Sequence, residues 1–258
     1  MKYVQYDKRN GITKITLNRQ EAMNCFNYAF LLELEEIVDQ LRTDRETRIV
    51  IITGSGDKAF SAGADLKERK TLNETEVRRN VLKIRTVFDK IADLPMPTIA
   101  AINGYAFGGG FELVLACDFK IAAETAKLGL TETSWGIIPG AGGTQRLTRL
   151  IGEMRAKELI FTARKITALE AFHCGILTKV VSQQSLIPAC EKLADEIMKN
   201  APIAIKQAKF AIQQGAGNDM KSALNIEQSA YELTIPTRDR LEALEAFSQK
   251  RRPIFKGE

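Results

Sequence analysis

Residues 97–113 read PTIAAINGYAFGGGFEL, a β-prone run followed by a glycine-rich loop and an apolar segment. The run 98–102 predicts a buried strand, and the glycines within 104–110 predict a loop that leads into a helix. Backbone N–H groups have no partner in the first turn of a helix, where the helix dipole is positive. The segment therefore predicts a place that can hold an anion.

A second stretch, AGADL at residues 62–66, places small residues in the same way between a predicted strand and a predicted helix. Glycine lacks the Cβ that would block a ligand, so N–H donors from the two loops can converge on one oxygen atom. That geometry is an oxyanion hole. Glycine runs also serve tight packing of a helix on a strand, and both interpretations stay open at this point.

Two carboxylates follow these loops. Glu112 comes three residues after Gly109, about one turn into the predicted helix, within an apolar run. Glu132 lies twenty residues further on, a separation long enough for a return strand. A lone acid in an apolar run either faces water on an amphipathic helix or is buried, and burial raises its pKa and suits it to proton transfer. The sequence leaves both alternatives open.

The rest of the chain predicts two domains. Up to residue 94 we expect strands at 3–6, 12–17 and 48–54 and helices at 30–41 and 74–94. This α/β pattern continues to about residue 181. Beyond residue 201 the pattern predicts helices only, with apolar stripes in 203–212, 223–233 and 241–247. We therefore expect a first domain over residues 1–200 and a helical domain over 201–258.

Composition excludes several classes of protein. The chain has 258 residues, 45% hydrophobic and 27% charged, which predicts a buried core rather than disorder. Its net charge of +5 is spread along the chain and does not imply nucleic acid. No apolar leader or run long enough to span a membrane is present. We expect a soluble, cytoplasmic protein.

Nucleophilic and metal chemistry find little support in the sequence. His173 is the only histidine, so a multi-histidine metal site is excluded, and its surroundings predict an ordinary helix residue. Cys25, Cys117, Cys174 and Cys190 show no C-x-x-C spacing and are interpreted as reduced thiols. The chain contains no G-x-S-x-G nucleophile elbow, no phosphate-binding P-loop and no G-x-G-x-x-G dinucleotide motif. We expect no metal.

Three segments carry a resemblance to a known family: residues 59–67 (AFSAGADLK), residues 97–113, and residues 139–147 (PGAGGTQRL). Together they resemble the enoyl-CoA hydratase/isomerase (crotonase) superfamily, and the likeness extends from about residue 4 to the end. It implies an α/β fold, a crotonase-like spiral of ββα turns with a C-terminal all-helical trimerisation domain. It also implies an acyl-CoA thioester substrate and a homotrimer or a hexamer built as a dimer of trimers.

The resemblance also implies roles for individual residues. The oxyanion-hole N–H groups would be those of Ala64 and Gly109, and the catalytic acids would be Glu112 and Glu132. The residues that would contact CoA are Ala62, Asp65, Leu66, Lys67 and Gly140, with Phe247 and Lys250 completing a neighbouring subunit's site. Lys67 also begins a basic segment, residues 67–90, that would attract CoA phosphates. No cofactor is implied, because CoA is part of the substrate.

Both hydratase acids are present, whereas other branches of the superfamily typically change one or both. The expected function is therefore that of an enoyl-CoA hydratase, a hydro-lyase that adds water to a 2-enoyl-CoA to give a 3-hydroxyacyl-CoA in fatty acid metabolism. We assign activation of the water chiefly to Glu112 and delivery of the α-proton chiefly to Glu132, with the two acids coupled through that water.

Within the superfamily, four segments are similar to the AU-rich-RNA-binding methylglutaconyl-CoA hydratases: 64–69, 157–161, 234–241 and 255–258. One alternative is therefore a methylglutaconyl-CoA hydratase of leucine breakdown, and another is an RNA-binding or scaffold protein with vestigial activity. The lysine comb of that branch falls here on Tyr28, Leu32 and Glu36, so no nucleic-acid partner is expected. The sequence does not determine the acyl chain or the role of Trp135.

Overall fold

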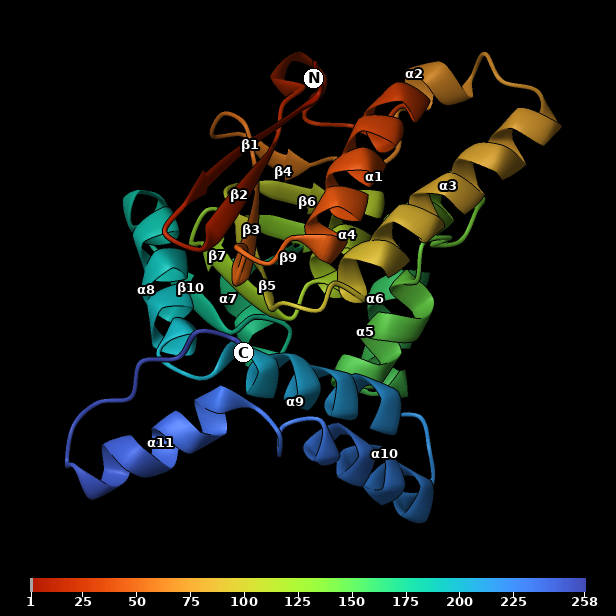
Figure 1. Cartoon of the computed structure of the whole chain (residues 1–258). Helices are drawn as coiled ribbons and strands as arrows, with labels where there is room; N and C mark the ends of the chain where they lie inside the picture. Colours follow the sequence, from red (N-terminus) through yellow and green to blue (C-terminus); the bar gives the residue numbers. More distant parts are fainter. Residues whose placement is uncertain (1) are drawn as a thin grey trace. The chain divides into compact units, whose positions relative to one another are not determined.

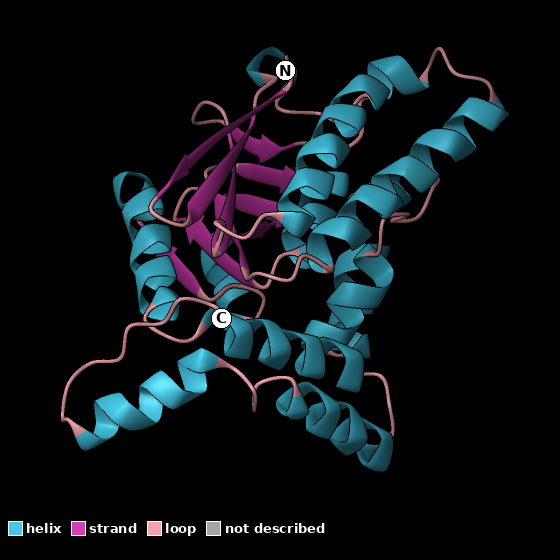
Figure 2. Cartoon of the chain, in the orientation of Figure 1, coloured by secondary structure: helices cyan, strands magenta, loops and turns pink. Residues whose placement is uncertain are grey.

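The computed structural model describes residues 2–258 (Figure 1). The backbone divides into two compact units: the residues up to Leu94 together with Thr98–Glu191, and Pro95–Pro97 together with Lys192–Glu258. The strands are β1 (Val4–Arg9), β2 (Ile12–Leu17), β3 (Ile49–Gly54), β4 (Ala59–Ser61), β5 (Thr98–Ile102), β6 (Tyr105–Phe107), β7 (Phe119–Ala123), β8 (Lys127–Gly129), β9 (Ile166–Thr167) and β10 (Lys179–Val181). All of them lie in the first unit (Figure 2).

Helices follow most of the strands. The α-helices are α1 (Tyr28–Thr43), α2 (Leu66–Arg69), α3 (Glu74–Ala92), α4 (Gly109–Ala116), α5 (Gly143–Ile151), α6 (Glu153–Phe161), α7 (Ala168–His173), α8 (Leu186–Met198), α9 (Pro202–Gly215), α10 (Met220–Glu232) and α11 (Arg238–Ser248). Short 3₁₀ helices are η1 (Gln20–Ala22), η2 (Glu132–Trp135) and η3 (Gln183–Ser185). No helix formed by residues 2–258 is long and apolar enough to cross a membrane.

The strands form two sheets, and from β3 to β8 consecutive strands alternate between them. The larger sheet has the order β1-β2-β3-β5-β7-β10, and the smaller has the order β4-β6-β8-β9. Each turn of the chain adds one strand to each sheet and then a helix: β3, β4 and α2 to α3, then β5, β6 and α4, then β7, β8 and α5. This repetition confirms the expected spiral of ββα turns.

The local elements agree with the sequence pattern. The first two expected strands form a hairpin: β1 and β2 pair antiparallel, and Asn10 and Gly11 between them have positive φ angles of 50° and 80°, which suit a tight hairpin turn. Strands β3 and β5 are buried throughout and pair in parallel, as expected for unbroken apolar runs. Helices α1 and α3 pack side by side (Figure 1).

The smaller sheet positions the candidate site. Strands β4, β6 and β8 are parallel neighbours, with Ser61 opposite Ala106 and Phe107 opposite Gly129. Their carboxyl ends therefore meet at one edge of the sheet. The loop 62–65 after β4, the start of α4 after β6 and η2 after β8 all leave from that edge. Segments about 70 residues apart in sequence are thus brought together.

The second unit is helical, which confirms the expected helical C-terminal region. Helices α9 and α10 pack against each other, with Gly215 close to Ala223. The end of the chain is fixed by Asp239, whose carboxylate accepts hydrogen bonds from the N–H groups of Lys256 (2.7 Å) and Gly257 (2.9 Å). Asp239 is itself buried.

Gly110 gives a first testable prediction, because a Cβ at this position would overlap the carbonyl oxygen of Ser61 in β4. We expect Gly110→Ala to lower the free energy of unfolding by about 2 kcal/mol, the usual cost of overpacking a core. Gly109→Ala is the matched control, because a Cβ there has only ordinary contacts, the nearest at 3.6 Å. Thermal unfolding of both variants measures the difference, and equal melting temperatures would contradict the packing described here.

Candidate active site

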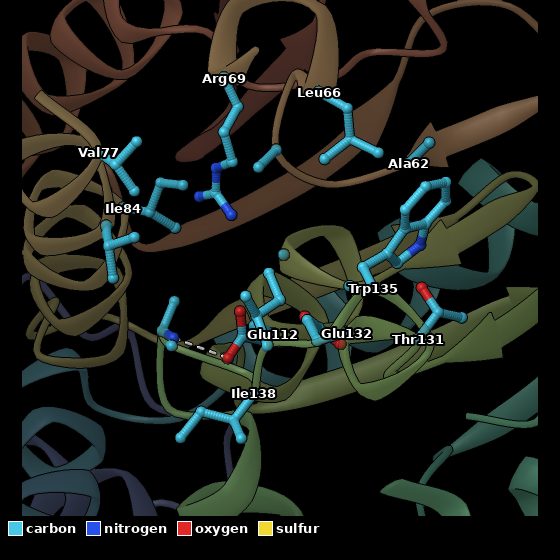
Figure 3. A pocket seen from close by; sticks show the side chains of 17 residues that line it. Ala62, Leu66, Arg69, Val77, Ile84, Glu112, Thr131, Glu132, Trp135 and Ile138 are labelled. Atoms are coloured by element: carbon cyan, nitrogen blue, oxygen red, sulfur yellow. Dashed lines mark hydrogen bonds between the residues drawn. The ribbon is translucent and has the colours of Figure 1, made fainter. Parts of the chain in front are cut away.

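A pocket of about 620 Å³ opens at this edge of the smaller sheet (Figure 3). Two acids, Glu112 and Glu132, face into it together with one cation, Arg69. The remaining walls consist of small backbone segments and apolar side chains. The lining residues are Ala62, Ala64, Leu66, Arg69, Val77, Val81, Ile84, Gly108, Gly109, Glu112, Thr131, Glu132, Trp135, Ile137, Ile138, Gly140 and Ala141.

The loop that carries Ala64 is held by a parallel bridge to Phe26. The N–H of Phe26 donates to the carbonyl oxygen of Gly63 (2.8 Å), and the N–H of Asp65 donates to the carbonyl oxygen of Phe26 (2.9 Å). Neither of these hydrogen bonds involves the N–H of Ala64. Gly63 has a φ of +91°, and a Cβ there would lie 2.8 Å from the carbonyl oxygen of Phe107. Only glycine fits this approach without strain.

Gly109 is the first residue of α4, so its N–H belongs to the helix end that has no intrahelical partner. A Cβ on Gly109 would lie 3.7 Å from the amide nitrogen of Ala64, which places the two loops side by side. Among residues 2–258, neither the N–H of Ala64 nor that of Gly109 donates a hydrogen bond to a protein atom. Two unpaired N–H donors therefore line one pocket, as an oxyanion hole requires.

Glu112 is 3% exposed, so the alternative of a solvent-facing residue on an amphipathic helix is wrong. Its Oε1 accepts hydrogen bonds from the N–H groups of Ala141 and Gly143, both at 2.8 Å. Burial raises the pKa of Glu112, while these two N–H donors and the charge of Arg146 oppose the rise. The segment between η2 and α5 thus fixes one carboxylate oxygen, and Figure 3 shows the other directed into the pocket.

Glu132 begins η2 and approaches the same space from the opposite loop. A Cβ on Gly108 would lie 3.2 Å from its Oε1, so the glycine leaves room for the carboxylate. The Oε2 of Glu132 is buried without a hydrogen-bond partner. Burial and the neighbouring charge of Glu112 raise the pKa of Glu132 to about 7. A carboxyl group that is half protonated near neutral pH is suited to proton transfer.

Comparisons with known proteins agree with this geometry. The sequence profile of the family described as Enoyl-CoA hydratase/isomerase matches residues 7–258. The chain belongs to this family. A crystal structure of an enoyl-CoA hydratase from Bacillus anthracis superposes with a TM-score of 0.97 at 52% identity, covering 99% of this chain and 100% of that one. The chain is therefore a crotonase-fold enzyme, a hydratase or an isomerase, to which an acyl-CoA thioester substrate fits.

Two curated relatives cover nearly the whole chain. The Bacillus subtilis protein YngF is 51% identical over 97% of this chain and 96% of its own. Human mitochondrial methylglutaconyl-CoA hydratase is 46% identical over 98% of this chain and 76% of its own. Relatives with different names thus match to similar extents, so the family is shown while the substrate is not.

Some of the residues expected to contact CoA lie in the pocket of this crotonase-fold enzyme and others do not. Ala62, Leu66 and Gly140 line it. Asp65 does not, because its carboxylate caps α2 and accepts a hydrogen bond from Arg19 at 2.6 Å. Lys67 is exposed beside it. Phe247, in the last turn of α11, and Lys250, just after that helix, belong to the second unit, and Phe247 is 85% exposed.

The structure adds pocket residues to which no role was assigned from the sequence. Val77, Val81 and Ile84 form an apolar wall on α3, and the three- and four-residue spacing of this helix was the signal available for them. Trp135, 66% exposed, is placed at the pocket by η2. Arg69 lines the pocket from the end of α2. No cluster of three or more His, Cys, Asp or Glu suited to a metal occurs within the described chain.

The raised pKa of Glu132 predicts a pH-dependent cost in stability. Between pH 4.5, its ordinary pKa, and about 7, the unfolded chain loses this proton while the folded chain retains it. The unfolded state then binds fewer protons, so the free energy of unfolding falls as pH rises through this window. Glu132→Gln removes the cost. We expect its gain in melting temperature over the unsubstituted protein to grow from pH 5 to pH 8.

The control for this prediction is Glu124→Gln, which removes a carboxylate from an exposed position of the same unit. Its melting temperature relative to the unsubstituted protein should not change with pH in this way. A difference for Glu132→Gln that is constant between pH 5 and pH 8 would contradict a raised pKa.

Proposed function

We propose that this enzyme is an enoyl-CoA hydratase, which adds water across the 2,3 double bond of a 2-enoyl-CoA to give a 3-hydroxyacyl-CoA. The observation that carries the proposal is the presence of two carboxyl groups, the buried Glu112 and the half-buried Glu132, in one pocket with two unpaired N–H donors. Addition of water needs a group that accepts a proton and a group that donates one, and this pocket supplies both.

The proposed first step polarises the thioester. Its carbonyl oxygen would accept hydrogen bonds from the N–H groups of Ala64 and Gly109. Electron density then moves toward that oxygen, and the carbon at position 3 becomes electrophilic. The donors stabilise the enolate charge that develops in the transition state, which is where their contribution to the rate is largest.

The two glutamates would complete the addition. The ionised carboxylate of Glu112 takes a proton from water as the hydroxyl bonds to carbon 3, and the protonated carboxyl of Glu132 delivers its proton to carbon 2. Transfer of a proton from Glu112 back to Glu132 through water then restores both groups. The addition causes no net oxidation or reduction, so the proposed reaction needs no cofactor beyond the CoA that the substrate carries.

The test is a hydration assay with a panel of 2-enoyl-CoA thioesters, including 3-methylglutaconyl-CoA, with the corresponding 3-enoyl-CoA thioesters as isomerase substrates. We expect hydration to dominate, because an isomerase needs only one group to shuttle a proton between two carbons. Conversion of 3-enoyl-CoA without any hydration of 2-enoyl-CoA would refute the proposal and favour an isomerase. The relative rates would also decide whether the alternative of a methylglutaconyl-CoA hydratase holds.

We further propose that the protein assembles as a homotrimer, or as a hexamer of two trimers, through its helical unit. Large apolar side chains of this unit are exposed, and α9 and α10 line a further hollow of about 580 Å³. The exposed side chains are those of Phe210, Ile212, Met220, Leu224, Tyr231, Leu233, Leu241, Leu244, Phe247 and Ile254. An apolar surface of this extent is typical of a protein interface.

Light scattering at micromolar concentration tests the assembly. We expect the mass of three or six chains, because burial of the apolar side chains stabilises the oligomer. A stable monomer would contradict the proposal. In the proposed oligomer, the resemblance implies that Phe247 and Lys250 contribute to a neighbouring subunit's CoA site.

A further inference from the structure

Arg69 is a cation in the pocket that the proposed reaction does not use. It ends α2 and, as Figure 3 shows, directs its guanidinium into the pocket beside Val77 and Ile84. Within residues 2–258, its side chain forms no ion pair and no hydrogen bond. A guanidinium carries five N–H donors and cannot be deprotonated, so these donors require water or a ligand.

Neither glutamate forms an ion pair or a hydrogen bond with the guanidinium of Arg69. Glu112 is held on its Oε1 by two backbone N–H groups, and the Oε2 of Glu132 has no hydrogen-bond partner. The charge of Arg69 nevertheless acts on Glu132, where it opposes the rise of that pKa. Arg69 therefore shares the space of the reacting groups while its donors stay available.

The position of Arg69 relates it to the acyl chain. Ala64, whose N–H would hold the thioester oxygen, lies five residues earlier in the same loop and helix. The neighbouring wall of Val77, Val81 and Ile84 offers only apolar contacts. A chain that runs from the thioester along this wall passes the guanidinium, which is planar and matches a carboxylate with two parallel hydrogen bonds.

We propose that Arg69 binds a carboxylate at the far end of the acyl chain, so that the preferred substrates are 2-enoyl-CoA thioesters of dicarboxylic acids. This inference rests on the proposed function for the site and adds the class of substrate. An uncharged acyl chain would displace water from Arg69 without offering an acceptor, and an unpaired charge in such surroundings is costly. Arg69 thus favours the charged chain and disfavours the uncharged one.

A binding experiment separates this inference from the catalytic proposal. Glutaryl-CoA and pentanoyl-CoA differ only in a terminal carboxylate against a methyl group, and neither has a double bond to hydrate. Titration calorimetry should give a ~10²-fold preference for glutaryl-CoA, the range expected for a charge-assisted bidentate pair. Arg69→Gln should abolish the preference, and Arg69→Lys should retain part of it because the charge remains without the planar fork.

Lys70→Gln is the matched control. It removes the same charge from the adjacent, exposed position, which does not line the pocket. Its preference for glutaryl-CoA should stay within about twofold of that of the unsubstituted protein, since isolated surface charges contribute little. Both ligands carry the same CoA, so any general effect on CoA binding cancels in the ratio.

Two results would overturn the inference: equal affinities in the unsubstituted protein, or a preference that survives Arg69→Gln. A preference that survives while both ligands lose affinity equally would assign Arg69 to a CoA phosphate instead. A second measurement, the kcat/KM for hydration of glutaconyl-CoA and of 2-pentenoyl-CoA, separates failure of this inference from failure of the hydratase proposal. Failure to hydrate either, with the binding preference intact, refutes the hydratase proposal alone. Hydration of both at equal kcat/KM, without a binding preference, refutes the role of Arg69 alone.

Discussion

Replacing either Glu112 or Glu132 by glutamine is expected to lower kcat for hydration of a 2-enoyl-CoA by ~10²-fold or more. Glutamine keeps the size of the side chain but can neither take a proton from water nor deliver one to carbon 2. Both roles act in the transition state, so affinity for a saturated acyl-CoA should stay nearly intact. The double variant should lose less than the product of the two single losses, because the acids act on one water molecule.

Steady-state kinetics and calorimetric titration on the same preparations measure these two quantities. Glu124→Gln serves again as the control for loss of a carboxylate, because it is exposed in the same unit. Circular dichroism confirms that each variant is folded. Turnover at the unsubstituted rate by either folded variant would refute its assignment as a catalytic acid.

The sequence, through its resemblance to the family, was sufficient to predict that Glu112 and Glu132 act together as the catalytic acids. Glu112 lies in the first turn of α4, as the glycine-rich loop before it predicts. Glu132 is reached through β7 and β8, two short strands within the twenty residues that separate the acids. The apolar run around Glu112 left burial and exposure open, and the structure decides for burial by supplying two N–H donors that make a buried carboxyl group tolerable.

Other features of the site depend on contacts that no local pattern records. The pKa of Glu132 is raised because residues from several segments bury its carboxyl group and because the charge of Glu112 lies nearby. Arg69 follows a run of charged residues at the end of α2, where sequence alone suggests a solvated surface. In the structure it lines the pocket together with Val77, Val81 and Ile84 of α3. Trp135 likewise becomes part of the site through the position of η2.

The backbone donors can be tested at one atom. Gly109→Pro removes the N–H of Gly109, and Pro is tolerated in the first turn of a helix, where that N–H has no intrahelical partner. We expect kcat for hydration to fall by ~10²- to 10³-fold, the effect of deleting one oxyanion-hole donor. Gly109→Ala controls for the added Cβ and keeps the N–H, whereas the Cδ of proline also occupies the place of the amide hydrogen, so the loss in the proline variant is an upper bound on the contribution of the donor.

The comparison therefore rests on the ratio between the proline and the alanine variants rather than on either value alone. Any obstruction by a Cβ is shared by both variants, since a Cβ on Gly109 meets Gly63, Ala64 and Phe26 at 3.6–3.7 Å. Melting temperatures should be similar, because neither variant breaks a hydrogen bond of α4. Equal kcat values for the two variants would show that the N–H of Gly109 does not stabilise the enolate oxygen, and the donor would then have to be sought elsewhere in the pocket.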